Sequence, residues 1–214
     1  MKNIILSIYE TLLKRYGNPD WWPAETPFEV IVGAVLTQNC AWSNVEKAIA
    51  NFDDKLSPES ILIMDTAELI EKIRPAGFFK QKAVYLKNVT EWFAKYNFNV
   101  SAIKKEPLHK IRTELLAVKG IGYETADSIL LYAFGFPSFV VDAYTMRMCD
   151  RIPITIGTEY QSVKAYFENH LPENVKIYNN YHALIVINGK EHCKKKPLCD
   201  NCPLYDICGR KFEI

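Results

Sequence analysis

The 214-residue sequence contains no apolar run as long as a membrane span, and its beginning lacks a cleavage-type signal peptide. The first residues instead form an amphipathic helical pattern, so we expect a cytoplasmic protein. An excess of one charge is also missing, because the formal net charge is +1. Any contact with a polyanion must therefore use local basic patches. The candidate patches, each of which can also be ordinary solvated surface, are Lys104-Lys105, Lys194-Lys195-Lys196 and Arg210-Lys211.

Strand-type alternation of apolar and polar residues is absent beyond a few positions, as are low-complexity segments and long linkers. Hydrophobic residues nevertheless make up 49% of the chain, which is typical of a globular protein. They recur at helical spacing, and the length suits one large domain or two small ones. The sequence therefore predicts an all-α fold. The clearest helices are expected over residues 3–16, 27–36, 80–95, 142–151, 158–170 and 172–189.

Cysteines are few, and four of the six lie near the end with the spacing Cys193-x5-Cys199-x2-Cys202-x5-Cys208. A disulfide scaffold is not expected in a chain this long without a signal peptide. Four thiolates this close together can instead hold a metal. Zinc suits four cysteine ligands, whereas short loops that wrap one compact object modestly favour a [4Fe–4S] cluster. The other two thiols, Cys40 and Cys149, are expected in the core.

A glycine turn separates two helical patterns in the segment Leu116-Ala-Val-Lys-Gly-Ile-Gly-Tyr-Glu-Thr-Ala126. Gly120 and Gly122 allow a sharp turn and the close approach of another molecule, and free amides at the start of the next helix would bind a phosphate. Asp142 follows sixteen residues after Ala126, and an acid near such a turn suits chemistry on a nucleic acid. Asp142 also fits the N-cap of the next helix, and the residues alone favour that structural role.

Aromatic and polar residues gather in two segments near the start of the chain. Trp21-Trp22-Pro23 follows the first helix as a loop, for which partial burial is the simplest explanation. Gln38 and Asn39 end the nearly all-apolar helix at 27–36 and need partners, either inside the protein or on a ligand. Trp42 ends the same segment, three residues after Asn39.

Together these motifs resemble the helix-hairpin-helix DNA glycosylase superfamily, to which endonuclease III belongs, over nearly the whole chain. The Leu116–Ala126 segment is similar to the family hairpin, and Asp142 stands at the position of the catalytic aspartate. His182-x5-Asn188-Gly189-Lys190 is similar to the approach to the iron–sulfur loop, although the first cysteine gap has five residues where endonuclease III has six. The resemblance implies two α-helical lobes, residues 24–133 and residues 1–23 plus 134–214, with a [4Fe–4S] cluster in the second.

The resemblance also implies a monomer that acts on double-stranded DNA, flips out a damaged base and cuts its N-glycosidic bond. Asp142 would stabilise the sugar cation and position water. Gln38 and Asn39 would fill the vacated gap or touch the opposite base, unless they only cap the buried helix and satisfy neighbours. The expected DNA contacts are Gln38, Asn39, Lys119, Gly120, Gly122, Thr125, Lys194, Lys195 and Lys196.

Glu124 stands two residues after the second hairpin glycine, where bifunctional members of the superfamily carry a nucleophilic lysine. Without an amine at this position, no Schiff base with the sugar can form. The resemblance therefore implies a monofunctional glycosylase without AP-lyase activity. Glu124 itself can be a solvated helix residue, a partner for a lysine or an acid in the base pocket.

Within the superfamily, the aromatic residues look most like those of 3-methyladenine DNA glycosylase III, where they line the pocket for an alkylated purine. The helicobacter-type enzyme of that group lacks the cluster expected here. One alternative is a glycosylase for another base, such as mismatched thymine or uracil, hypoxanthine, adenine or an oxidised pyrimidine. The other is a non-catalytic, cluster-dependent DNA-binding or redox-sensing protein. The expected base pocket consists of Trp21, Trp22, Pro23, Trp42 and Glu124.

Overall fold

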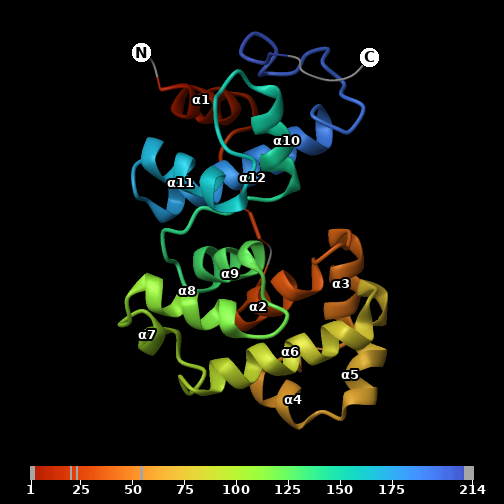
Figure 1. Ribbon diagram of the computed structural model, residues 1–214. Coiled ribbons are helices and arrows are strands. Elements are labelled where there is room, and N and C mark those ends of the chain that lie inside the picture. Colours follow the sequence, from red (N-terminus) through yellow and green to blue (C-terminus); the bar gives the residue numbers. More distant parts are fainter. Residues whose placement is uncertain (1–2, 20, 23, 54, 210–214) are drawn as a thin grey trace. The chain divides into compact units, whose positions relative to one another are not determined.

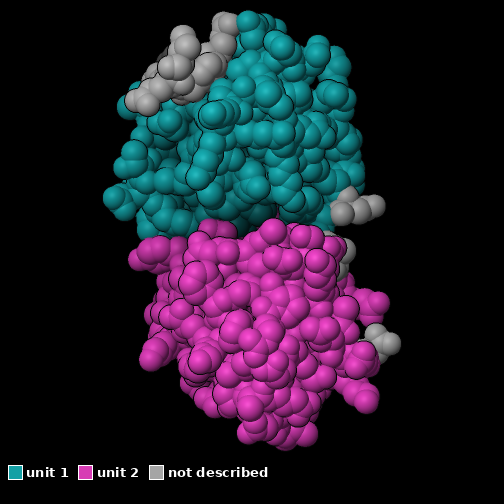
Figure 2. All heavy atoms as spheres, turned by 90° about the vertical axis from the view of Figure 1, so that its right-hand side faces the viewer, with its two compact units in different colours: residues 1–23, 137–214 teal, residues 24–136 magenta. Residues whose placement is uncertain are grey.

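The computed structural model describes residues 3–19, 21–22, 24–53 and 55–209, and within these ranges it contains helices and no strands. The predicted all-α fold is therefore confirmed. The chain divides into two compact units, coloured separately in Figure 2. Unit 1 comprises residues 1–23 and 137–214, and unit 2 comprises residues 24–136. None of the described helices is long and apolar enough to cross a bilayer.

Unit 2 is built around α2 (Pro27–Leu36), whose side chains are nearly all buried. Thr26 caps this helix by accepting a hydrogen bond of 3.1 Å from the Glu29 amide, and Pro27 occupies its first turn. The helix packs against α6 and the α9–η2 segment (Figure 1). The other elements of the unit are α3 (Trp42–Ala50), α4 (Pro58–Ile63), α5 (Thr66–Ile73), η1 (Arg74–Ala76), α6 (Phe79–Ala94), α7 (Val100–Ile103), α8 (Leu108–Ala117), α9 (Tyr123–Ser128) and η2 (Ile129–Ala133).

Unit 1 is built around α12 (Val175–Glu191), which packs against α1 (Ile4–Tyr16) and α10 (Ala143–Arg151) (Figure 1). α11 (Tyr160–His170) completes the unit. Tyr181 on α12 is fully buried, and its hydroxyl donates to the Ile5 carbonyl over 2.8 Å. Burying an aromatic side chain of this size contributes roughly 1.5–3 kcal/mol. The core of unit 1 therefore fixes α12, the helix that runs into the cysteine loop.

The helix expected from residue 172 begins later, at Val175. Asn174 is the residue that caps it, because its side-chain oxygen accepts a hydrogen bond of 3.1 Å from the Ile177 amide. An asparagine oxygen satisfies an orphan amide at the start of a helix, which a proline side chain cannot do. The helix also ends two residues beyond Gly189, the position where the sequence predicts its end.

Candidate active site

The predicted hairpin lies between α8 and α9 in unit 2. Gly120 has a φ of +99°, and a Cβ atom there would lie 2.1 Å from the Tyr85 ring, so only glycine fits. Gly122 is the N-cap of α9, and a Cβ atom there would meet nothing within 4 Å. Asn88 donates to the Lys119 carbonyl over 3.1 Å. Side chains from α6 thus fix the first half of the turn, while its second half stays open.

A buried ion pair joins the two helices of the hairpin. The Arg112 guanidinium on α8 donates two hydrogen bonds, of 2.8 and 2.9 Å, to the carboxylate of Asp127 on α9. Asp127 is fully buried, so its ionised form needs this partner. The same guanidinium lies 5.5 Å from the ring centre of Tyr123. These contacts fix how α9 presents its first amides.

The side chain of Gln38, in the turn after α2, also contacts the hairpin. Its side-chain nitrogen donates to the Gly120 carbonyl and to the Thr125 hydroxyl, both over 3.0 Å. The structure therefore brings Gln38, Gly120 and Thr125 together, and the amide nitrogen satisfies neighbours inside the protein. The Thr125 side chain is buried, so a contact from this residue to DNA would have to use its backbone. Lys119, Gly122 and Glu124 are exposed.

Asn39 differs from Gln38 because it lies exposed at the tip of the turn after α2, with a left-handed φ of +50°. Lys82, which is 2% exposed, ties this turn to the one before α6. Its ammonium donates to the Leu36 and Ala76 carbonyls over 2.8 Å each, and burial lowers its pKa. Two residues after Ala76, Phe78 is 67% exposed at a φ of +46°.

Sequence reasoning missed both Lys82 and Phe78. Lys82 cannot be found from local patterns, because its partners are backbone carbonyls, one of them 46 residues away. Phe78 had a weak signal, since it directly follows Gly77 in a turn between two helices. An exposed aromatic residue in a left-handed conformation is unusual.

The expected base-pocket residues lie in both units. Trp42, in unit 2, is partly exposed, and its indole nitrogen donates to the Glu46 carboxylate over 3.0 Å. Trp21 and Trp22, in unit 1, are likewise partly exposed. The Lys190 ammonium lies 5.7 Å from the centre of the Trp21 ring, so one face of this indole already carries a cation. Pro23 lies outside the described residues.

Asp142 is the N-cap of α10, as the sequence predicts. Its Oδ1 atom accepts hydrogen bonds from the Thr145 amide (2.7 Å) and from the Thr145 hydroxyl (2.9 Å). Its Oδ2 atom lies 3.5 Å from Nε2 of His182 on α12. Burial alone would raise the pKa of Asp142, but His182 and the Thr145 bonds outweigh it and lower the pKa below its ordinary value. The surroundings of this carboxyl, which is 11% exposed, thus favour its ionised form.

The extended segment before Asp142 is fixed by α11. Glu168 accepts a hydrogen bond of 2.9 Å from the Phe139 amide, and the buried Lys164 donates to the Ser138 hydroxyl over 2.7 Å. The Tyr160 hydroxyl accepts from the Val141 amide over 3.4 Å. These bonds position the backbone that leads into Asp142.

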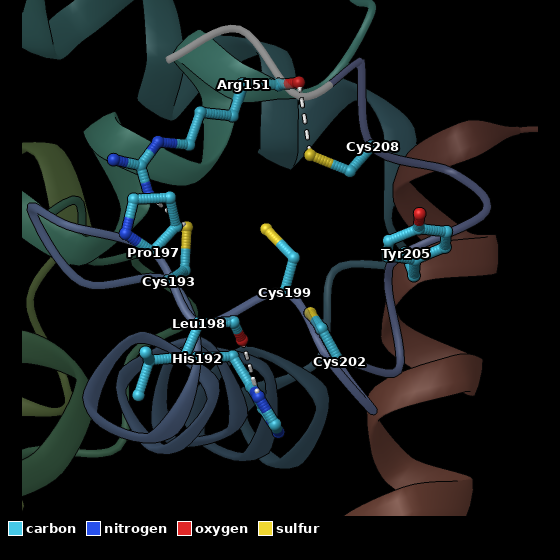
Figure 3. A pocket seen from close by; sticks show the side chains of 9 residues that line it. All are labelled: Arg151, His192, Cys193, Pro197, Leu198, Cys199, Cys202, Tyr205 and Cys208. Atoms are coloured by element: carbon cyan, nitrogen blue, oxygen red, sulfur yellow. Dashed lines mark hydrogen bonds between the residues drawn. The ribbon is translucent and has the colours of Figure 1, made fainter. Parts of the chain in front are cut away.

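The four cysteines of the C-terminal loop line one pocket, shown in Figure 3. Arg151, at the end of α10, donates to Sγ of Cys193 over 3.1 Å and to the Lys194 carbonyl over 2.8 Å. Burial raises the pKa of the Cys202 thiol, and the nearby Cys193, Cys199 and Cys208 add to the rise. Clustered thiols of this kind ionise readily only when a cation neutralises them.

In the part of the chain that the structure describes, no three His, Cys, Asp or Glu side chains are arranged to hold a single metal ion. The side chains of Lys194, Lys195 and Lys196 are exposed, between the first two cysteines of the loop. Cys149 is buried, as expected, and burial raises its pKa to about 12. The expectation for Cys40 is wrong, because it is only half-buried in the turn after α2.

Comparisons with known proteins identify the family of the chain. The chain is 50% identical over 213 residues, 97% of either chain, to a Methanocaldococcus jannaschii protein whose name assigns it to the DNA repair glycosylases. Its fold is similar to that of Helicobacter pylori 3-methyladenine DNA glycosylase bound to 1,N6-ethenoadenine, with a TM-score of 0.76, 30% identity and coverage of 88% of this chain and 97% of that one. A trapped covalent endonuclease III–DNA intermediate gives a TM-score of 0.82 at 25% identity, with coverage of 97% and 95%. Residues 32–173 match the family described as HhH-GPD superfamily base excision DNA repair protein, and the chain belongs to this family.

Proposed function

We propose that the protein is a monofunctional DNA glycosylase that hydrolyses the N-glycosidic bond of alkylated purines such as 3-methyladenine in double-stranded DNA. The observation that carries this proposal is the state of Asp142. Its side chain is only 11% exposed, yet its pKa is lowered, with Oδ1 bound by Thr145 and Oδ2 next to His182. An ionised carboxylate in a site of low dielectric stabilises the positive charge that develops on the sugar when the base leaves. Asp142 also positions the attacking water.

The hairpin holds the DNA backbone in this proposal. The amides at Gly120 and Gly122 would bind phosphates without reading sequence, and the Arg112–Asp127 pair keeps them in place. Lys119 and Lys194 to Lys196 are exposed and add positive charge for the same purpose. Of the two polar residues after α2, Asn39 is the better candidate for filling the gap that a flipped base leaves. Gln38 is tied to the hairpin, whereas Asn39 is exposed at the tip of its turn.

Glu124 supports a reaction that stops at the abasic site. It is exposed on the hairpin side where a lyase would need an amine nucleophile. Hydrolysis by water then leaves the sugar–phosphate backbone intact. Borohydride trapping tests this point directly: we expect no covalent protein–DNA adduct, and an adduct would contradict the monofunctional assignment.

Alkylated purines are proposed because a cationic base suits stacked, electron-rich rings. Trp22 and Trp42 supply such rings, and a cation over an aromatic ring contributes roughly 0.5–1 kcal/mol at an exposed site and about 2 kcal/mol or more when desolvated. Lys190 favours a second candidate, because its ammonium already lies over Trp21 and would repel a cationic base. A neutral damaged or mismatched base is therefore the alternative substrate.

A panel of duplexes, each with one lesion, separates these substrates under single-turnover conditions. We expect release of 3-methyladenine and a loss of at least about 100-fold in the Asp142→Asn variant. Release of a different base alone would overturn the choice of substrate. Equal rates for the Asp142→Asn variant and the unsubstituted protein would favour a non-catalytic DNA-binding protein.

We propose that the cysteine loop holds a [4Fe–4S] cluster, with zinc as the alternative. Cys193, Cys199, Cys202 and Cys208 would hold it, since all four line one pocket whose other walls include Pro197 and Leu198. The Arg151 guanidinium at Cys193 Sγ would offset the negative charge of the thiolates.

Iron, sulfide and zinc content, together with visible absorption, distinguish the two metals. We expect iron and sulfide in the purified protein and a loss of both in the Cys202→Ser variant. The matched control is Cys40→Ser, which changes a thiol outside the pocket and should leave the iron content unchanged. Stoichiometric zinc without iron would overturn the cluster.

A further inference from the structure

His182 faces the carboxylate that the proposed chemistry uses. It lies on α12 and is 6% exposed, and α12 packs against α10, the helix that Asp142 caps. Its Nε2 atom is 3.5 Å from Oδ2 of Asp142. The two residues are 40 positions apart in the sequence, so only the packing of the two helices brings them together.

The two oxygens of Asp142 have separate tasks. Oδ1 accepts hydrogen bonds from the amide and the hydroxyl of Thr145 and so caps the first turn of α10. A helix cap of this kind is a structural role that an uncharged side chain can also fill. Oδ2 is the oxygen that faces His182, at 3.5 Å from Nε2. The imidazole therefore acts on the half of the carboxylate that the cap does not use.

The other ionisable groups nearby are directed elsewhere. On α10, Arg147 donates to the Cys193 carbonyl over 2.6 Å, Arg151 binds the same loop, and Asp150 is exposed. On α12, Lys190 lies over Trp21. On α11, Lys164 and Glu168 pair with each other and with the backbone of Phe139, while the Tyr160 hydroxyl contacts the Val141 amide. His182 is the side chain whose ring nitrogen lies 3.5 Å from Oδ2 of Asp142.

We propose that His182 is a positioning residue for base excision, which fixes Oδ2 of Asp142 and keeps it ionised in its buried site. The proposal rests on the catalytic role of Asp142 given above. It assigns no contact between His182 and the substrate and no proton transfer. A carboxylate deprived of this partner would still cap α10 but would take up a proton at a higher pH, because burial disfavours its charged form.

The test is the pH profile of single-turnover base release between pH 5 and 8. In the unsubstituted protein, Asp142 is expected to be ionised throughout this range. We therefore expect no fall in the rate of base release at acid pH (an acid limb of the profile) from this group. In the His182→Ala variant, an acid limb should enter the range, and release at neutral pH should fall by about 10- to 100-fold. His182→Gln retains an N–H donor, so it should restore part of the rate and move the limb back towards acid pH.

A matched control is His170→Gln, which changes an exposed histidine of the same unit. Its profile should overlay that of the unsubstituted protein. A uniform fall in rate for His182→Ala at every pH, without an acid limb, would indicate a purely structural role and would overturn the proposal. An unchanged profile would do the same.

Two outcomes separate this proposal from the proposed function. If Asp142→Asn still releases base at the full rate, the catalytic assignment of Asp142 fails, and the role of His182 fails with it. If Asp142→Asn is inactive while His182→Ala keeps the profile of the unsubstituted protein, only the role of His182 fails. Affinity for a duplex with an abasic site, measured for each variant, confirms that the fold and the DNA-binding surface are retained.

Discussion

Arg112 and Asp127 form a buried ion pair with two hydrogen bonds, of 2.8 and 2.9 Å, between the helices on either side of the glycine turn. The Asp127 side chain is fully buried, and that of Arg112 is 17% exposed. Removing one partner would take both of these hydrogen bonds away from the other charge. The pair therefore makes the conformation of the turn depend on a contact that no local pattern encodes.

Breaking this pair should destabilise the protein and weaken its binding to DNA. For Arg112→Ala we expect a loss of about 3–5 kcal/mol in the free energy of unfolding, because Asp127 stays buried. Denaturant unfolding measures the stability. The affinity for an undamaged duplex shows whether the hairpin still binds DNA. The control is Arg74→Ala, which breaks an exposed pair with Glu71 and should change the stability little. Equal effects of the two variants would contradict this account.

The two hairpin glycines should respond differently to alanine. Gly120→Ala places a Cβ atom 2.1 Å from the Tyr85 ring at a φ of +99°, so we expect a loss of roughly 1–3 kcal/mol or more and weaker DNA binding. Gly122→Ala has open space and no positive φ, so it should unfold almost like the unsubstituted protein. Thermal unfolding compares the two. A Gly122→Ala variant as unstable as Gly120→Ala would refute the difference in environment.

Stability should depend on pH through Asp142. Its pKa is lowered in the folded protein, so its ionised form contributes stability that is fully present above the unfolded-state value of about 3.9 and is lost as the pH falls through the folded value. Asn at this position still caps α10, so the difference between the protein and its Asp142→Asn variant isolates the charge. Urea unfolding from pH 7 to pH 3 should show this difference shrinking below about pH 4. The exposed Asp150→Asn variant is the control, and a difference that is constant with pH would argue against an ionised Asp142.

Lys190 should determine how well a cationic base is accepted. Lys190→Met removes the ammonium over Trp21 but keeps a side chain of similar length. We expect release of 3-methyladenine to rise relative to that of hypoxanthine by about 2- to 30-fold, which corresponds to roughly 0.5–2 kcal/mol for a cation over an indole. Lys176→Met, an exposed lysine on the same helix, is the control. An unchanged ratio would show that the Trp21 face lies outside the base pocket.

The sequence by itself determined much of this protein, because local rules encode those features. Helical periodicity predicted the all-α fold, and the segment Gly120-Ile-Gly122 predicted the turn. The position of Asp142 before an amphipathic segment predicted its capping role. The cysteine spacing predicted a single compact site, and the side chains of all four cysteines do line one pocket.

Tertiary structure alone decided which side chains act on these features. His182 meets Asp142, Gln38 binds the hairpin, Lys82 joins two turns, and Lys190 covers Trp21. Each contact joins residues that are far apart in the sequence or that bind backbone atoms, so neither spacing nor residue type predicts it. Periodicity reports which face of a helix is buried, but the partner of a buried polar group depends on how helices pack, and that packing decides whether Asp142 remains charged.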